Sequence, residues 1–301
     1  MKIAVQGLGR MGMQITRKLA EDGHFVIAHN RSREPIDEAV EHGAKPAYDK
    51  KSVLNLFGDD QPVVWIMLPA DLVDGQVDEW LDILPHDSII IDGGNSDFRK
   101  TKLLNDKITN KGSHLIDIGT SGGIWGYQNG FSMMCGSDSK EYFDVVIPAL
   151  ASLAKPEGAY QYFGPSGSGH FVKMVHNAVE YGMMESLAEG YHILKEGPYK
   201  QLDLGAAGEV WQHHSVVTSW LNELCRDVLK ENPNLDGVDG YVAESGEARW
   251  TLELANSLNI PMPAIQSAFD VRVASQNGSI NFSTKLLAAM RNKFGGHKIN
   301  K

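Results

Sequence analysis

Lys2-Ile3-Ala4-Val5-Gln6-Gly7-Leu8-Gly9-Arg10-Met11-Gly12 follows the initial Met1 and decides the fold of the first half of the chain. Its first five residues predict a short apolar strand, which runs straight into the pattern G-x-G-x-x-G and then into a helix to about Asp22. The glycines allow a tight turn and a close backbone approach, while the helix N-terminus offers N–H groups to a pyrophosphate. Between a first strand and a first helix, this pattern is a strong indication of dinucleotide binding.

The rest of the first half alternates between predicted strands and helices. Further apolar strands are expected at Phe25–His29, Val63–Leu68, Ser88–Asp92 and Leu115–Gly119. This alternation is typical of an α/β fold with a parallel sheet. Near residue 165 the pattern changes to helices alone, including one long stretch expected at Leu202–Leu229. The sequence therefore predicts a Rossmann-type α/β domain over residues 1–165. An all-α domain for substrate binding and dimerisation, with a C-terminal tail, is expected over residues 166–301.

Composition limits the classes of function. The 301 residues are 42% hydrophobic and 22% charged, with a net charge of −10, which indicates a globular chain and disfavours nucleic acid as a partner. No signal region or membrane span is recognised, and two cysteines offer neither a disulfide framework nor metal-ligand spacing. His213 and His214 are adjacent and therefore point to different helix faces, so no metal site is expected. These features favour a cytoplasmic protein that acts on a small molecule.

The residues after the second strand indicate which dinucleotide is bound. An NAD site normally carries Asp or Glu there to hold the ribose 2′-hydroxyl. Here Asn30 replaces the acid and Arg31 follows, so NADP is favoured over NAD, unless Arg31 merely lies over the adenine. The expected cofactor contacts are Gly7, Leu8, Gly9, Arg10, Met11, Gly12, Asn30, Arg31, Ser32, Met67, Leu68 and Asn95.

Two loops after later strands predict ligand contacts. Ligands of such sheets bind beyond the carboxyl ends of strands, which places Asn95, in Asp92-Gly93-Gly94-Asn95-Ser96, near a nicotinamide or a substrate. A purely structural turn is the alternative for this loop. In Thr120-Ser121-Gly122-Gly123, two glycine N–H groups beside a hydroxyl predict a small nest for a carboxylate or another anion.

The helix expected to start the second half carries an unusual set of polar side chains. At about 100° per residue, Lys173, His176, Asn177, Glu180 and Tyr181 share an arc of roughly 140°. Apolar residues behind them, among them Val179, are expected to pack on a core. A plain solvated face is the alternative interpretation, but such faces usually carry little besides Lys and Glu.

Taken together, these motifs resemble the decarboxylating 6-phosphogluconate dehydrogenases in their short form, over essentially the whole chain. The resemblance rests on Gly7–Gly12, Asp92–Ser96, Ser121–Gly123, the segment 169–181, and Arg291-x-x-Phe294-Gly295-x-His297. It implies oxidation of 6-phosphogluconate to ribulose 5-phosphate and CO₂ in the pentose phosphate pathway, with Lys173 as general base and Glu180 as general acid. The implied substrate-binding residues are Asn95, Ser121, Gly122, Gly123, His176, Asn177, Tyr181, Arg249, Arg272, Arg291 and His297.

The chemistry fits these residues independently of the resemblance. Oxidation of a secondary alcohol needs a base for the hydroxyl proton, so Lys173 must be partly neutral when the substrate binds. The 3-keto acid then loses CO₂ if its carbonyl is polarised, which a protonated Lys173 can do. Glu180 can protonate the resulting enediol if it is kept neutral.

The chain departs from the long form of this family in two ways. Arg249 stands where the long form has Lys, and the second half of the long form's helical domain is missing. The tail that contains Arg291 and His297 matches one that reaches, in this family, into a neighbouring subunit. The resemblance therefore implies an obligate homodimer at least.

Two other functions remain open. A non-decarboxylating β-hydroxyacid dehydrogenase, similar to 3-hydroxyisobutyrate dehydrogenase, shares the two-domain plan but has Asn where this chain has His176. A non-catalytic cofactor-binding relative is expected to have a damaged lysine helix or a basic surface, and the sequence has neither.

Overall fold

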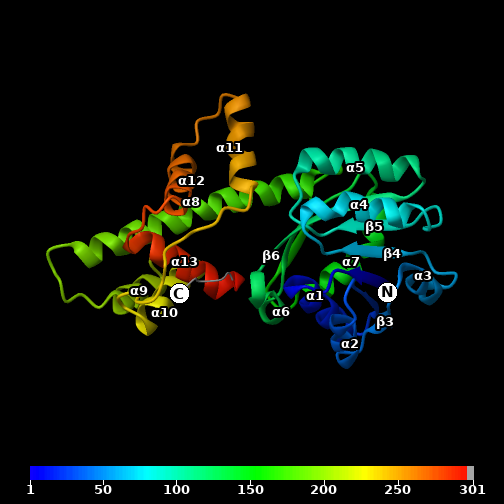
Figure 1. Ribbon diagram of the computed structural model, residues 1–301, viewed down its shortest axis with the longest axis horizontal. Helices are drawn as coiled ribbons and strands as arrows, with labels where there is room; N and C mark the ends of the chain where they lie inside the picture. The colour runs from blue at the N-terminus through cyan, green and yellow to red at the C-terminus, as the bar shows by residue number, and fades with distance from the viewer. Residues whose placement is uncertain (297–301) are drawn as a thin grey trace. The chain divides into compact units, whose positions relative to one another are not determined.

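The computed structural model describes residues 1–296, which form two compact units that divide between Met174 and Val175. The division falls inside the longest helix, α8 (Ser168–Glu196), which begins in the first unit and ends in the second (Figure 1). The predicted domain boundary after residue 165 lies just before this helix and stays a prediction.

The first unit is built on one sheet of eight strands in the order β3-β2-β1-β4-β5-β6-β7-β8. Its strands are β1 (Lys2–Gln6), β2 (Phe25–His29), β3 (Lys45–Ala47), β4 (Val63–Ile66), β5 (Ile89–Asp92), β6 (His114–Ser121), β7 (Ser132–Gly136) and β8 (Ala159–Tyr162). All neighbours are parallel except β6 and β7, which are antiparallel. The carboxyl ends of β1, β2, β4 and β5 therefore meet at one edge, where the predicted ligand loops follow.

Successive residues of each strand pack into cores on opposite faces of the sheet. Ile3 and Val5 of β1 belong to one buried cluster, whereas Ala4 between them belongs to another. Figure 1 shows helices α1 and α7 on one face and α4 and α5 on the other. The helices of this unit are α1 (Arg10–Glu21), α2 (Glu34–Glu41), α3 (Lys50–Phe57), α4 (Ala70–Leu81), α5 (Phe98–Asn110), the 3₁₀ helix η1 (Gly123–Trp125), α6 (Gly126–Asn129) and α7 (Lys140–Ala154). Burial on both faces explains why the central strands read as continuous apolar runs.

The second unit contains helices and loops in the described part of the chain. Besides the rest of α8, its helices are α9 (Leu204–Gln212), α10 (Trp220–Glu231), α11 (Glu247–Ser257), α12 (Pro263–Gln276) and α13 (Phe282–Gly295). One apolar cluster joins α8, α9, α10 and α13, and a smaller one joins α8, α11 and α12. The predicted fold class, a Rossmann-type α/β domain followed by a helical domain, is confirmed.

Local predictions differ from the structure at two places. The helical stretch expected at Leu202–Leu229 is two helices, because residues 213–219 form a connection in which His214 has a φ of +59°. On α8, Val179 was expected to pack on a core but is 46% exposed, whereas Tyr181, expected on the polar face, is 4% exposed. The core therefore lies closer to the predicted functional face than the periodicity indicates.

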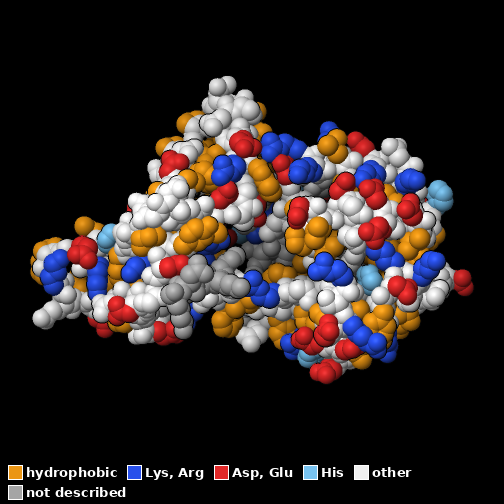
Figure 2. Space-filling model, in the orientation of Figure 1, with side chains coloured by type: hydrophobic (Ala, Val, Ile, Leu, Met, Phe, Trp, Pro, Cys, Tyr) orange, Lys and Arg blue, Asp and Glu red, His pale blue; other side chains and the backbone are white. Residues whose placement is uncertain are grey.

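None of the helices that the structure describes is long and apolar enough to cross a membrane. On the face seen in Figure 2, Lys and Arg side chains are interspersed with Asp and Glu side chains. This mixture agrees with the acidic overall charge and gives that face no extended basic surface.

Candidate active site

The glycine-rich turn after β1 has the geometry that a dinucleotide requires. Gly7 has a φ of +96°, and a Cβ at this position would lie 2.5 Å from the carbonyl oxygen of Met67. A Cβ on Gly12 would lie 3.0 Å from the carbonyl carbon of Gly7, so this glycine lets α1 approach the turn. Gly9 is the N-cap residue of α1, and no atom lies within 4 Å of where its Cβ would be. The residues present therefore fit a pyrophosphate at the N-terminus of α1.

Asn30, which stands where an NAD site normally carries an acid, holds this turn. Its Oδ1 accepts a hydrogen bond from the backbone N–H of Leu8 at 3.1 Å, and its Nδ2 donates to the carbonyl oxygen of Ser32 at 3.3 Å. Arg31 and Ser32 are exposed immediately after it. Asn30 thus connects the end of β2 to the glycine-rich turn and leaves Arg31 accessible to a ligand.

The Asp92–Ser96 loop after β5 is a tight turn folded around a buried carboxylate. Asp92 accepts hydrogen bonds from the N–H of Gly94 at 3.0 Å and from the hydroxyl of Ser96 at 2.8 Å. Burial raises the pKa of Asp92 above its ordinary range. Asn95 is exposed at the tip of the turn, so the structural role and the predicted ligand-binding role belong to different residues of one loop.

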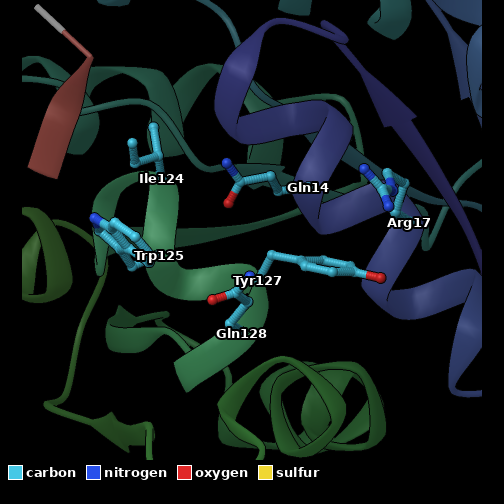
Figure 3. Close-up of a pocket in the computed structure, with 6 residues that line it drawn as sticks. All are labelled: Gln14, Arg17, Ile124, Trp125, Tyr127 and Gln128. Carbon is cyan, nitrogen blue, oxygen red and sulfur yellow. The ribbon is translucent and has the colours of Figure 1, made fainter. Parts of the chain in front are cut away.

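The predicted anion nest follows β6, and a pocket lies directly beyond it. Gly122 and Gly123 have φ angles of +128° and +54°, which a residue with a side chain rarely adopts. The pocket, of about 220 Å³, lies between α1 and this segment (Figure 3), and its lining residues are Gln14, Arg17, Ile124, Trp125, Tyr127 and Gln128. The Arg17 guanidinium lies 4.7 Å from the centre of the Tyr127 ring. None of the predicted site residues lines this pocket.

Lys173 lies in the first turns of α8 and is only 5% exposed. A Cβ on Gly119 of β6 would lie 2.6 Å from the Cγ of Lys173, so the missing side chain of the glycine provides the space for the lysine. Gly169, one turn before Lys173, is equally constrained, since its Cβ would lie 2.5 Å from the carbonyl oxygen of Met134. Gly119 on β6 and Gly169 on α8 thus allow the start of α8 to pack directly against the sheet.

The buried carboxylate of Asp117 fixes where α8 begins. Its two oxygens accept hydrogen bonds from the backbone N–H groups of Gly167 at 2.7 Å and His170 at 2.8 Å. An acceptor at the N-terminus of a helix satisfies donors that have no partner within the helix. His170 is itself 1% exposed, and its Nδ1 is hydrogen-bonded to the Thr101 hydroxyl at 2.7 Å. The position of Lys173 is therefore set from β6 and α5, through residues that the sequence analysis did not single out.

In the second unit, α8 contributes His176, Asn177, Glu180 and Tyr181. Asn177 donates a hydrogen bond from Nδ2 to Oε1 of Glu247 on α11 at 2.9 Å, and its Oδ1 lies 3.0 Å from Nδ1 of His176. The Tyr181 hydroxyl accepts from the backbone N–H of Ser245 at 3.2 Å. The predicted polar face is therefore tied to the start of α11.

Two of the predicted phosphate ligands, Arg272 and Arg291, are buried in this unit. Their exposed fractions are 1% and 8%. The Arg272 guanidinium lies 3.3 Å from the centre of the Tyr181 ring. Burial lowers the pKa of Arg272 to about 10 and also lowers that of Arg291, while the nearby charge of Glu180 opposes both shifts. In the part of the chain that the structure describes, no carboxylate forms a salt bridge with either guanidinium.

The remaining predicted phosphate ligands are placed differently. Arg249 is about half exposed and donates two hydrogen bonds to one carboxylate oxygen, Oε1, of Glu244, from Nε at 3.2 Å and from Nη2 at 2.7 Å. Arg291 was expected to reach into a neighbouring subunit, but it lies on α13, buried inside its own chain, where the charges of Glu180 and Glu247 act on it. His297 lies outside the described residues.

Two acidic residues in this region were not predicted from the sequence. Glu247 is 3% exposed, and a first-turn Glu is so common in helices that its position gave no signal. Glu185 on α8 is 6% exposed, and burial raises its pKa to about 7, helped by Glu189 and opposed by Arg272. Glu185 lies one turn beyond Tyr181, on the apolar side of the helix. From that position its burial could have been predicted.

Comparison with known proteins agrees with this geometry. The family model of the NAD binding domain of 6-phosphogluconate dehydrogenase matches residues 2–164, and that of the 6-phosphogluconate dehydrogenase C-terminal domain matches residues 169–281. A relative from Haloferax volcanii, named as an NAD(+)-dependent, decarboxylating 6-phosphogluconate dehydrogenase, is 36% identical over an alignment of length 301 that covers 99% of this chain and 98% of that protein.

Solved structures show the same architecture. The 6-phosphogluconate dehydrogenase of Plasmodium falciparum, described in its apo form and in complex with NADP⁺ and with 6-phosphogluconate, matches with a TM-score of 0.83 and 26% identity. The match covers 92% of this chain but 62% of that one, so this chain spans less than two thirds of its length. A 3-hydroxyisobutyrate dehydrogenase from Mycobacterium tuberculosis matches with a TM-score of 0.72 at 18% identity, covering 95% of this chain and 97% of that one, which shows a shared fold.

These matches cover both units, and one relative has nearly the same length as this chain. They agree with the glycine-rich turn after β1 and with the lysine helix that follows the α/β unit. The chain is therefore an oxidoreductase with an NAD(P)-binding Rossmann domain, and it belongs to the 6-phosphogluconate dehydrogenase family.

Proposed function

We propose that this protein oxidises and decarboxylates 6-phosphogluconate to ribulose 5-phosphate and CO₂ in the cytoplasm, as a step of the pentose phosphate pathway. The observation that carries the proposal is the pair of buried guanidiniums, Arg272 and Arg291, beside Glu180. Buried charges in proteins are normally paired, and these two have no carboxylate in a salt bridge within the described residues. A phosphate dianion is a ligand that would pair with both.

The catalytic roles follow from the groups on α8. Lys173 accepts the proton of the substrate's 3-hydroxyl and, once protonated, donates a hydrogen bond to the resulting carbonyl oxygen while CO₂ leaves. Glu180 then protonates C1 of the enediol. Asn95, Ser121, Gly122, Gly123, His176 and Asn177 hold the sugar acid, with Tyr181, Arg249, Arg272, Arg291 and His297 around its phosphate.

The glycine-rich turn and the end of β2 hold the cofactor in this proposal, and a bound nicotinamide supplies the hydride acceptor. We propose NADP in preference to NAD, because the exposed Arg31 offers a guanidinium to a 2′-phosphate and Asn30 stands where an NAD site normally carries a carboxylate. The names of the relatives point both ways, since the Haloferax volcanii protein is NAD(+)-dependent and the Plasmodium falciparum structure binds NADP⁺.

We also propose that the protein is a homodimer at least, with the tail around His297 completing the site of a neighbouring subunit. Inactive Lys173→Met subunits mixed with inactive His297→Ala subunits should regain activity after exchange, because some hybrid dimers then contain one intact site. A mixture that stays inactive despite proven exchange would contradict a shared site.

Two active-site variants test the reaction itself. Lys173→Met should abolish reduction of the cofactor, because the hydroxyl proton cannot leave. Glu180→Gln should mainly slow protonation of the enediol, so hydride transfer in a single turnover should be less affected than steady-state turnover. Equal loss of every partial step in both variants would contradict the division of roles.

A non-decarboxylating β-hydroxyacid dehydrogenase is the second candidate. It is favoured by the fold match to 3-hydroxyisobutyrate dehydrogenase, which covers nearly the whole of both chains. For this alternative, 6-phosphogluconate would not release CO₂, and a small β-hydroxy acid would be the better substrate.

A further inference from the structure

Glu247, Asn177 and His176 form a chain of side-chain hydrogen bonds in the second unit. Oε1 of Glu247 lies 2.9 Å from Nδ2 of Asn177, and Oδ1 of Asn177 lies 3.0 Å from Nδ1 of His176. Glu247 is 3% exposed, so water does not compete freely for its carboxylate. The contacts run from α11 to two consecutive residues of α8, the helix that also carries Lys173.

The direction of each hydrogen bond in this chain is determined by the group at its end. An ionised carboxylate can only accept, so the Asn177 amide must turn its NH₂ group toward Glu247. Its carbonyl oxygen then faces His176 and can also only accept. The proton between the two side chains must therefore be on Nδ1 of His176, and in a neutral imidazole this leaves Nε2 as a hydrogen-bond acceptor.

This tautomer requires an ionised Glu247 carboxylate, and two neighbouring groups stabilise a negative charge there, the N-terminus of α11 and the guanidinium of Arg291. Glu247 is the first residue of α11, where the helix dipole stabilises a negative charge. Its negative charge also acts on the buried Arg291, whose pKa it raises against the larger lowering by burial. The second carboxylate oxygen, Oε2, is buried and has no hydrogen-bond partner among the described residues. The Asn177 amide is therefore the hydrogen-bond donor that the structure gives to this carboxylate.

We infer that Glu247 is a positioning residue, which acts through Asn177 to hold His176 in the Nδ1–H tautomer. Nε2 of His176 then offers a lone pair to a hydroxyl group of the substrate, as a polyhydroxylated acid would present. The catalytic consequence rests on the proposed function, because it assumes that His176 contacts the substrate. The tautomer itself does not depend on that assumption.

The tautomer can be measured directly by long-range ¹H–¹⁵N NMR correlations on protein with ¹⁵N-labelled histidine rings, without substrate. The measurement is made at roughly pH 8.5, where an ordinary histidine is neutral. A His176→Gln variant identifies the signals of His176 among those of the 11 histidines. We expect the Nδ1–H pattern in the wild type. The Nε2–H pattern would overturn the inference without any variant.

The Glu247→Gln variant tests whether Glu247 sets the tautomer of His176. Glutamine can donate as well as accept, so it no longer forces the Asn177 amide into one orientation, and the Nε2–H tautomer of His176 should become populated. With 6-phosphogluconate, kcat/KM should fall by roughly tenfold or more, as expected when a buried hydrogen bond to the substrate is lost. Glu253→Gln, an exposed change on the same helix, should alter neither quantity.

The possible results separate the two claims. An unchanged tautomer in Glu247→Gln would overturn the role of Glu247, and a variant that does not fold leaves the wild-type tautomer as the deciding measurement. In a third outcome, the tautomer shifts in Glu247→Gln while the wild-type protein fails to act on 6-phosphogluconate. That combination would contradict the proposed function and leave the role of Glu247 intact.

Discussion

Gly119 of β6 and Lys173 of α8 share one close contact, in which a Cβ on the glycine would lie 2.6 Å from Cγ of the lysine. The position of the proposed base is thus linked to the strand that carries Ser121 at its end. Asp117, two residues before Gly119, binds the first N–H groups of the same helix. The strand therefore sets both where α8 starts and where its lysine lies.

Gly119→Ala should displace Lys173 and reduce kcat by tenfold or more. It should also lower the free energy of unfolding by about 1–3 kcal/mol, as overpacking in a core usually does. Gly190→Ala on α8 is the matched control, because a Cβ there meets no atom within 4 Å. It should keep full activity and raise stability by about 0.5–1 kcal/mol. A Gly119→Ala enzyme with wild-type kcat would show that the contact does not position the lysine.

The buried guanidiniums predict that simple oxyanions stabilise the protein. Inorganic phosphate at about a hundred times its Kd should raise Tm by roughly 3 °C or more. Arg272→Met should abolish this rise while leaving the ligand-free protein nearly as stable as before, because the variant replaces a buried charge with an apolar side chain. Arg226→Met, which changes an arginine paired with Asp227 on α10, should retain the rise. An equal rise in Arg272→Met would place the phosphate elsewhere.

Arg31 is expected to distinguish the two dinucleotides. Arg31→Ala should raise KM for NADP by roughly 10- to 100-fold, the effect of losing a charged hydrogen bond, and change KM for NAD less than about twofold. Arg33→Ala is the control, since Arg33 already lies 4.5 Å from the Tyr48 ring and 3.5 Å from Asp37. If Arg31→Ala weakened both cofactors equally, Arg31 would contact only the adenine and the NADP preference would be lost.

Glu185 gives the stability of the protein a specific pH dependence. Because burial raises its pKa to about 7 from its ordinary value near 4.5, the folded protein keeps a proton that the unfolded chain has already released. This contribution is fully present below about pH 4.5 and is lost as the pH rises to about 7, by up to about 3 kcal/mol. Urea denaturation at pH 5 and pH 8 should therefore show that Glu185→Gln gains stability over the wild type as the pH rises. The exposed Glu38→Gln should not, and the same result for both variants would contradict a buried, protonated Glu185.

The sequence predicted the parts of the fold that have strong local patterns. The glycine-rich turn and the central strands were predictable because their residues are constrained by close backbone approach and by burial on both faces. The antiparallel strand β7, Ser132–Gly136, was not, because its residues show no alternation and its pairing with β6 depends on contacts distant in sequence. The break between α9 and α10 was not predicted, because the residue with a positive φ of +59° is His214 and not a glycine, which would have indicated a turn.

The candidate site was predictable only in part for a related reason. Residues on the polar face of α8 could be grouped from helical periodicity alone. The groups that orient them could not, because Asp117 and Glu247 come from other elements and act through hydrogen bonds that only the folded chain brings together. The burial of Arg272 and Arg291 was also not predictable, since their helices, α12 and α13, have weak amphipathic patterns.

The ratio of CO₂ released to cofactor reduced, with 6-phosphogluconate as substrate, tests the central claim most directly. Labelled CO₂ from C1 and reduced nicotinamide are measured in the same reaction, with NADP and with NAD, and ribulose 5-phosphate is assayed as the product. The proposed function predicts one CO₂ for each cofactor reduced and ribulose 5-phosphate in equal amount. Reduction of the cofactor without release of CO₂ would contradict it and assign the protein to the non-decarboxylating β-hydroxyacid dehydrogenases.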